Sequence, residues 1–161
     1  MTIGVGDIIP DSYLKCIGSE GLKDIKTLEY FKDKKIVLFS VPGAFTPTCS
    51  AKHLPGYIEY ANDIKEKGVD EIICIAVNDA FVMHAWEKEQ NSKGKVTLLA
   101  DGNGDFSESL GLSFDGSSFG LGKRGKRFVM VIDNCKVIHL AIEKSGSFEV
   151  SSAESLLKFL S

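Results

Sequence analysis

The sequence predicts a single α/β domain with a central mixed β-sheet flanked by helices on both faces. Apolar runs of strand length alternate with amphipathic helical segments from about residue 35 to the end, an order typical of α/β folds. The 161 residues suit one domain over 1–161, long enough to bury a core without disulfides or metal ions. The sequence contains no internal repeat, low-complexity tract or linker that would divide it.

The first predicted strand leads into a loop and a helix. Residues 35–40 are a continuous apolar run, which predicts a buried strand, and the prolines and glycine of segment 41–48 predict a loop. A helix should follow, ending near residue 68 with a lysine-rich last turn and a glycine. Its apolar positions recur with helical spacing at Leu54, Tyr57, Ile58, Ala61 and Ile64. Pro55 within it predicts a kink.

The central part of the chain continues the alternation. Residues 72–77 predict a second buried strand, and together with the preceding strand and helix they form a right-handed βαβ unit. A helix opened by residues 78–79 should place four apolar side chains on one face, namely Phe81, Val82, Ala85 and Trp86. Residues 96–100 predict a third strand, and Asp105 should cap a short helix through Leu110.

The C-terminal part predicts a loop, a hairpin and a last helix. The glycine-rich stretch 111–125 should be a long exposed loop. Residues 127–132 and 137–142 read as two antiparallel strands with a four-residue connection. The pattern Ser-x-x-Glu from Ser151 predicts a capping box ahead of a closing amphipathic helix.

Composition narrows the class of partner. Hydrophobic residues make up 43% and charged residues 25%, and the formal net charge of -3 argues against nucleic acid or an anionic membrane as the main partner. No apolar stretch approaches the roughly 20 residues of a membrane span, and no targeting segment is recognisable at the start. Four scattered cysteines without a C-x-x-C pair favour a reducing compartment, so we expect a cytoplasmic protein.

Cys49 is the strongest candidate for chemistry. It follows a buried strand and lies at the start of a helix, where ligands of open α/β sheets usually bind. Unpaired backbone N–H groups and the helix dipole at such a position favour the thiolate, which is the nucleophilic form. The alternative is an ordinary small core residue, as most free cysteines are.

Neighbouring residues favour the catalytic interpretation. Thr46 adds a hydroxyl that can donate and accept hydrogen bonds, while Pro42 stiffens the loop. Of 19 basic residues only Arg124 and Arg127 are arginine, and a planar guanidinium suits a thiolate and a polar oxygen substrate together. Arg127 is the preferred candidate because it opens an apolar strand, whereas Arg124 should remain in the exposed loop. Both arginines could instead simply decorate a basic loop.

The segment 42–49 carries a family resemblance. Its sequence PGAFTPTC resembles the Pro-x-x-x-Thr-x-x-Cys signature of peroxiredoxins, and the fuller form is similar to the type II, or peroxiredoxin-5-like, branch. Further similar segments occur in order at residues 50–56, 77–82, 99–102 and 126–128. The resemblance therefore covers almost the whole chain.

The resemblance implies a thioredoxin-like fold and a peroxidase. It implies that Cys49 is the peroxidatic cysteine, attacking a hydroperoxide to give a sulfenic acid plus water or an alcohol. Thr46 and Arg127 would orient thiolate and peroxide, and Pro42 would shield the pocket. It further implies antioxidant activity, a homodimer, and no cofactor or metal.

The source of reducing equivalents is the open question. Some members of this branch carry a resolving cysteine near the C-terminus, but residues 144–155 contain none. Cys74 lies in an apolar strand and should be inert, Cys135 should be exposed but remote, and Cys16 belongs to the N-terminal strand region. We therefore expect glutathione with glutaredoxin, or thioredoxin, to reduce Cys49.

Other classes of function fit less well. A Cys-His hydrolase could use His53, but spacing i, i+4 leaves no clear place for an orienting carboxylate, so His53, like His84 and His139, is expected on the surface. A disulfide reductase needs two close cysteines, and a metal site needs a denser ligand pattern. A redox sensor or relay that uses Cys49 shares the first chemical step, and turnover would distinguish it.

Overall fold

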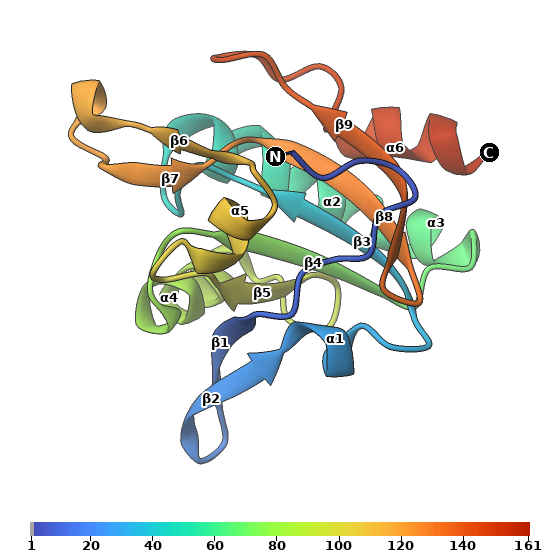
Figure 1. The fold of residues 1–161 in the computed structure, drawn as a ribbon, viewed down its shortest axis with the longest axis horizontal. Coiled ribbons are helices and arrows are strands. Elements are labelled where there is room, and N and C mark those ends of the chain that lie inside the picture. Colours follow the sequence, from blue (N-terminus) through green and yellow to red (C-terminus); the bar gives the residue numbers. More distant parts are fainter. Residues whose placement is uncertain (1) are drawn as a thin grey trace.

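A computed structural model describes residues 2–161 and has a seven-stranded mixed sheet at its centre (Figure 1). The sheet order is β2-β1-β5-β4-β3-β8-β9, with β3, β4 and β5 parallel and the other pairings antiparallel. The strands of this sheet are β1 (Tyr13–Gly18), β2 (Gly21–Lys26), β3 (Lys35–Ser40), β4 (Glu71–Ala76), β5 (Thr97–Ala100), β8 (Phe128–Asp133) and β9 (Lys136–Ile142). The predicted mixed sheet is confirmed.

Helices cover both faces of this sheet, as predicted. They are α1 (Thr27–Tyr30), α2 (Leu54–Glu59), α3 (Ala61–Glu66), α4 (Ala80–Gln90), α5 (Asp105–Ser109) and α6 (Ala153–Leu160). Successive side chains of a strand point to opposite faces. Val37 and Phe39 of β3 accordingly pack with residues of α2, α3, α4 and α6, while Ile36 and Leu38 pack with α5 and the N-terminal segment.

The helix predicted after residue 48 is segmented. A π-helical turn, Cys49–His53, precedes α2, and Tyr60 separates α2 from α3. Pro55 lies in the first turn of α2, where a proline's missing N–H costs little. The backbone changes from π- to α-helical at Leu54, immediately before Pro55.

The glycine-rich stretch is more ordered than predicted. Within it, β6 (Ser113–Asp115) pairs with β7 (Lys123–Gly125), and a 3-10 turn, Ser117–Phe119, lies between them. Figure 1 shows this pair projecting from the edge of the molecule. The prediction of a long exposed loop was wrong because two three-residue strands are too short to give a periodic pattern.

Several local details also differ from the prediction. The β8–β9 turn has two residues, Asn134 and Cys135, both with positive φ, as a tight hairpin turn requires. The first turn of α5 is capped by Asp101, whose carboxylate accepts backbone N–H groups of α5, and not by Asp105. The cap of α6 is Ser152 and not Ser151.

Helix α4 begins as predicted but buries only part of the predicted face. Asp79 caps it by accepting the N–H of Val82. Trp86 is buried with Ala80 and Met83, whereas Phe81 is 67% exposed. Of the four residues predicted to share the apolar face, Trp86 is buried and Val82 packs against the core, whereas Phe81 and Ala85 are exposed, so the prediction was correct only in part.

Of the elements within the first 34 residues, only a strand region that includes Cys16 was expected from the sequence. Strands β1 and β2 form an edge hairpin, and most of β2 is exposed. Edge strands carry mixed side chains on both faces, so they lack the apolar runs of central strands. Across residues 2–161, no helix is both long and apolar enough to traverse a bilayer.

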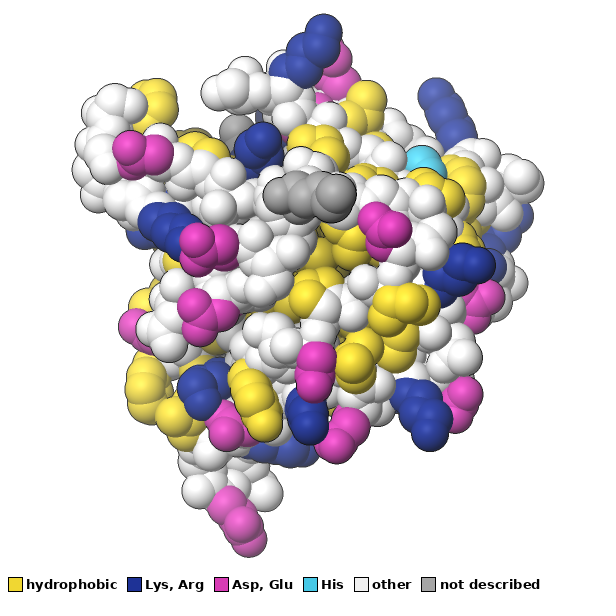
Figure 2. Space-filling view, in the orientation of Figure 1, with side chains coloured by type: hydrophobic (Ala, Val, Ile, Leu, Met, Phe, Trp, Pro, Cys, Tyr) yellow, Lys and Arg dark blue, Asp and Glu magenta, His cyan; other side chains and the backbone are white. Residues whose placement is uncertain are grey.

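Figure 2 shows basic and acidic side chains interspersed over the face in view, with apolar side chains between them. Charges of one sign are not gathered on this face. That distribution agrees with the weak net charge of -3 and gives no sign of a surface for a polyanion.

Candidate active site

The loop after β3 holds an unusual backbone conformation. Phe45 has φ of 64°, a left-handed conformation that is rare for a bulky residue and often marks a functional site. Helical backbone begins at Pro47, and Cys49 opens the π-helical turn. Single π-helical turns within α-helices are frequent at functional sites. Cys49 thus lies at a helix start directly after a buried strand, as predicted.

Arg127 contacts Cys49 directly. Its Nη2 donates to the Cys49 sulfur at 3.1 Å, and its Nη1 lies 2.7 Å from Nδ1 of His53. Arg127 immediately precedes β8, which pairs with β3, so the sheet brings it to the strand end from which Cys49 follows. A positively charged donor at this distance stabilises negative charge on sulfur.

His53 is buried, which contradicts its predicted place on the helix surface. Burial, and then the Arg127 guanidinium, lower the pKa of His53 from 6.5 to about 3, so the ring is neutral at physiological pH. Because guanidinium can only donate, Nδ1 must accept, and Nε2–H therefore donates to the Ser151 carbonyl, 3.1 Å away. Tyr57 donates to the same carbonyl at 2.7 Å.

Glu143 anchors the segment that carries this carbonyl. Its Oε2 accepts the backbone N–H groups of Glu149, Val150 and Ser151, and also the Ser151 hydroxyl. Burial alone would raise the pKa of Glu143, but these hydrogen bonds outweigh it and the pKa is lowered. A continuous chain of contacts therefore runs from Glu143 through Ser151, His53 and Arg127 to the Cys49 sulfur.

The other two predicted residues lie in the loop before Cys49. The Thr46 hydroxyl donates to the Gly43 carbonyl at 2.6 Å, which leaves its oxygen lone pairs free to accept; it makes no hydrogen bond to the Cys49 sulfur. Pro42 lines a cavity together with Arg127. The structure thus brings Cys49 and Arg127 into contact and places Thr46 and Pro42 beside them.

Arg124 is not an exposed loop residue, contrary to the prediction. It is half-buried in β7, and its Nε and Nη1 donate to the carbonyls of Leu121 and Pro42, each at 3.0 Å. A Cβ atom on Gly43 would lie 2.6 Å from the Arg124 Nη1, so only glycine permits this close approach. Arg124 therefore supports the loop from behind, while Arg127 faces the sulfur.

A cavity of about 530 Å³ opens beside Arg127 and Thr48. It is lined by Pro42, Thr48, Phe114, Lys126, Arg127, Glu143, Lys144, Ser145, Gly146 and Ser147. Cys49 itself is fully buried, but its neighbour Thr48 and its hydrogen-bond donor Arg127 both line the cavity. A small molecule in the cavity would therefore lie beside Arg127, the residue that donates to the Cys49 sulfur.

The remaining cysteines are all free. Cys74 is fully buried in β4, and burial raises its pKa, as expected for an inert thiol. Cys135 is 8% exposed and its thiol donates to the Leu28 carbonyl, so its predicted exposure was wrong. Burial also raises the pKa of Cys16, which lies in β1. Among residues 2–161, no cluster of side chains suitable for a metal ion is present.

Three supporting residues were missed by sequence reasoning. His53 shares the helical spacing of Tyr57 and Ala61, so its buried position was visible in the pattern. The scarcity of arginine drew attention to Arg124 but did not indicate its contact with the loop, and Glu143 carried no signal. The partners of both are backbone groups of segments distant in sequence or of an irregular loop.

The fold agrees with comparisons to known proteins. Residues 5–157 match the family model described as Redoxin. Peroxiredoxin-2B of Arabidopsis thaliana is 46% identical over 159 residues, 98% of each chain, and the chloroplastic Peroxiredoxin-2E of the same plant is 46% identical over 99% of this chain and 70% of its own. Reduced Prx3 of Vibrio vulnificus in complex with hydrogen peroxide has a TM-score of 0.96 and 48% identity, covering 99% of this chain and 100% of its own.

These similarities define a thioredoxin-like peroxidase built around a cysteine. The chain belongs to the Redoxin family and, within it, to the peroxiredoxins of the Prx2/Prx5 type. Peroxiredoxins are peroxidase oxidoreductases with an antioxidant role, so the chain is an enzyme of this class.

Proposed function

We propose that the Cys49 thiolate reduces hydrogen peroxide and organic hydroperoxides. The sulfur attacks one oxygen of the O–O bond, which breaks; the other oxygen takes a proton and leaves as water or an alcohol, and Cys49 becomes a sulfenic acid. The observation that carries this proposal is the hydrogen bond of 3.1 Å from Arg127 to the sulfur, beside an open cavity.

We assign different roles to the residues around the sulfur. Arg127 holds the thiolate and stabilises charge that develops on the peroxide oxygens. Thr46, with its free lone pairs, accepts a hydrogen bond from the peroxide. Pro42 forms the wall of the cavity and keeps water away from the reacting atoms. If Cys49→Ser retains full peroxide turnover, this assignment is wrong.

We propose a one-cysteine cycle in which an external thiol reduces the sulfenic acid. Cys74 and Cys135 are buried and Cys16 lies in β1, the second strand from the edge of the sheet, so none is placed as an evident resolving partner. Glutathione with glutaredoxin, or thioredoxin, would supply the electrons. Mass spectrometry of peroxide-treated protein without reductant should show added oxygen; a loss of two hydrogens into an internal disulfide would contradict the cycle.

A redox relay is the second candidate, because it needs the same buried thiolate and the same cavity. The number of peroxide molecules consumed per protein molecule distinguishes a peroxidase from a relay. A peroxidase consumes many peroxide molecules per protein when glutathione and glutaredoxin are supplied, and comparing glutaredoxin with thioredoxin as donor identifies the reductant. A relay consumes about one molecule and passes its oxidation to a partner protein.

We further propose that the protein is a homodimer of a reducing compartment, as in the cytoplasm. Support for the dimer comes from Phe45, half exposed, whose ring centroid lies 6.4 Å from that of Trp86 on α4, the helix that also exposes Phe81. Support for the compartment comes from the four free cysteines. Cell fractionation tests the compartment, and sedimentation equilibrium tests the dimer.

A further inference from the structure

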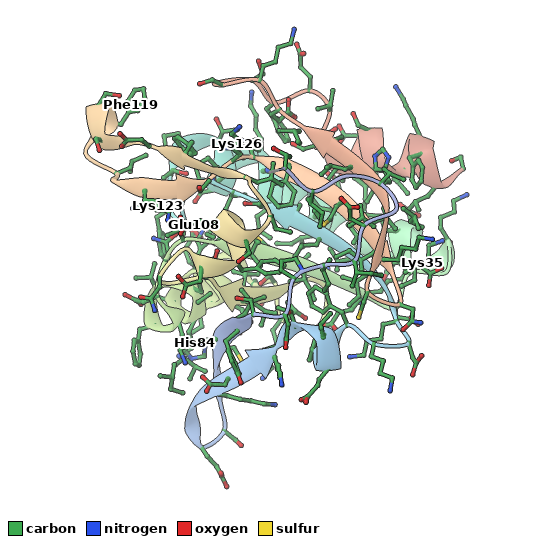
Figure 3. The ribbon with its side chains drawn as sticks, viewed as in Figure 1. Lys35, His84, Glu108, Phe119, Lys123 and Lys126 are labelled. Atoms are coloured by element: carbon green, nitrogen blue, oxygen red, sulfur yellow. The ribbon has the colours of Figure 1, made fainter. Side chains whose placement is uncertain are left out.

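The cavity beside Cys49 carries an excess of positive charge. Its lining includes Lys126, Arg127 and Lys144 against one acid, Glu143, in a chain whose formal net charge is -3. Both lysines are exposed, and among residues 2–161 neither takes part in a salt bridge. Figure 3 shows Lys126 near the β6–β7 pair, with Lys35 at the opposite side of the molecule.

The single acid, Glu143, offsets only one of these three positive charges. Oε2 of Glu143 accepts four hydrogen bonds from residues 149–151, and among residues 2–161 this carboxylate forms no salt bridge with either lysine. Arg127 is likewise committed to Cys49 and His53. The two lysines are therefore the free charges of the cavity, and Phe114 adds an apolar wall beside them.

We infer that this cavity selects organic hydroperoxides that carry a carboxylate. This inference rests on the proposed peroxidase function of Cys49 and adds its substrate class. The hydroperoxide group occupies the end beside Arg127, the hydrocarbon part lies against Phe114, and the carboxylate pairs with Lys126 and Lys144. Ammonium groups at the rim of a cavity raise both the local concentration and the affinity of an anionic substrate.

The test uses three peroxides with the same reacting group: cumene hydroperoxide, its para-carboxylate, and the methyl ester of that carboxylate. The rate of loss of the Cys49 thiol is measured by rapid quench without any reductant. The carboxylate should react roughly three- to ten-fold faster than the ester, with an advantage that shrinks as salt is added. In the double variant Lys126→Gln, Lys144→Gln the ratio should fall towards one, whereas the control Lys35→Gln should keep it.

Equal rates for carboxylate and ester, or a ratio that survives in the double variant, would overturn the inference. Glutathione is a second source of carboxylates, so its reaction with oxidised Cys49 is measured in the same variants. A double variant that slows only the glutathione step would assign the lysines to the thiol and also overturn the inference. If none of the three peroxides reacts with Cys49, the proposed function itself fails.

Discussion

At the scale of single residues, the site depends on the two contacts of the Arg127 guanidinium, one with Cys49 and one with His53. Arg127 holds the Cys49 sulfur through Nη2 and His53 through Nη1, and the compact ammonium of a lysine cannot reproduce that planar fork. Arg127→Lys should therefore lower kcat/KM for hydrogen peroxide by about 10²-fold, although the positive charge is kept. The steady-state rate of peroxide consumption gives this kcat/KM.

The matched control is Arg124→Lys. Arg124 donates only to backbone carbonyls of the supporting loops, so its loss should cost less than about tenfold through a looser loop. A larger effect at Arg124 than at Arg127 would reverse the roles assigned to the two arginines.

The buried His53 makes stability depend on pH. Its pKa is about 3 when folded against 6.5 as the ordinary value, so the unfolded chain binds more protons between these limits. The contribution of His53 should therefore lower the free energy of unfolding progressively as pH falls from 6.5 towards 3, by up to about 1.4 kcal/mol per pH unit. In His53→Gln the urea-unfolding free energy should fall less steeply over this range; the control is His84→Gln on α4. A parallel pH dependence in His53→Gln and the parent would contradict the buried neutral ring.

Residues of the candidate site could be predicted from the sequence where the chemistry allows few residue types. Cys49 and the preference for Arg127 followed from a strand end, a helix start and the scarcity of arginine. The orientation of Arg127 could not follow, because it depends on His53 and on a carbonyl of Ser151, 98 residues further along the chain. Contacts between distant segments leave no local periodicity in a sequence.

At the scale of elements, the segment between β9 and α6 is held by one carboxylate. Glu143→Gln keeps the shape but loses the charge that strengthens four hydrogen bonds, so the segment should open more often. Faster hydrogen exchange at the amides of residues 149–151 is expected. Peroxide turnover should also fall, because the Ser151 carbonyl that orients His53 moves with the segment. Unchanged exchange in this variant would show that other contacts hold the segment.

Element types were predictable but their ends were not. The buried strand 35–40 was placed with its observed ends, because a continuous apolar run fits a central strand alone. The cap of α6 was placed one residue early, since Ser151 and Ser152 offer the same hydroxyl and only the fold commits Ser151 to Glu143. Tertiary contacts, and not the local sequence, therefore determine which of the two adjacent serines caps the helix.

At the scale of the whole molecule, the proposed dimer makes a direct prediction. Phe81 is 67% exposed on α4, so a charge there would be buried if a second copy covers it. Sedimentation equilibrium should give a dimer for the parent and a monomer for Phe81→Glu. Phe159→Glu on α6, 43% exposed, is the control and should stay dimeric. A monomeric parent would refute the dimer.

The architecture as a whole followed from the sequence from residue 35 onward, because alternation of strand and helix periods defines an α/β sheet. The edge hairpin β1–β2 and the small β6–β7 pair did not, since exposed or short strands lack an apolar pattern. Both lie outside the central strands that position Cys49.

The side chain of Trp86 is an intrinsic fluorophore next to the segment that contains Cys49. Trp86 is the only tryptophan of the 161 residues, and its indole N–H donates at 3.0 Å to the hydroxyl of Ser50, the residue that follows Cys49. Indole emission is sensitive to its hydrogen bonds and to its immediate surroundings. Any displacement of the π-helical turn during oxidation would therefore change the fluorescence of the unmodified protein, so each step of the cycle can be followed in real time without a label.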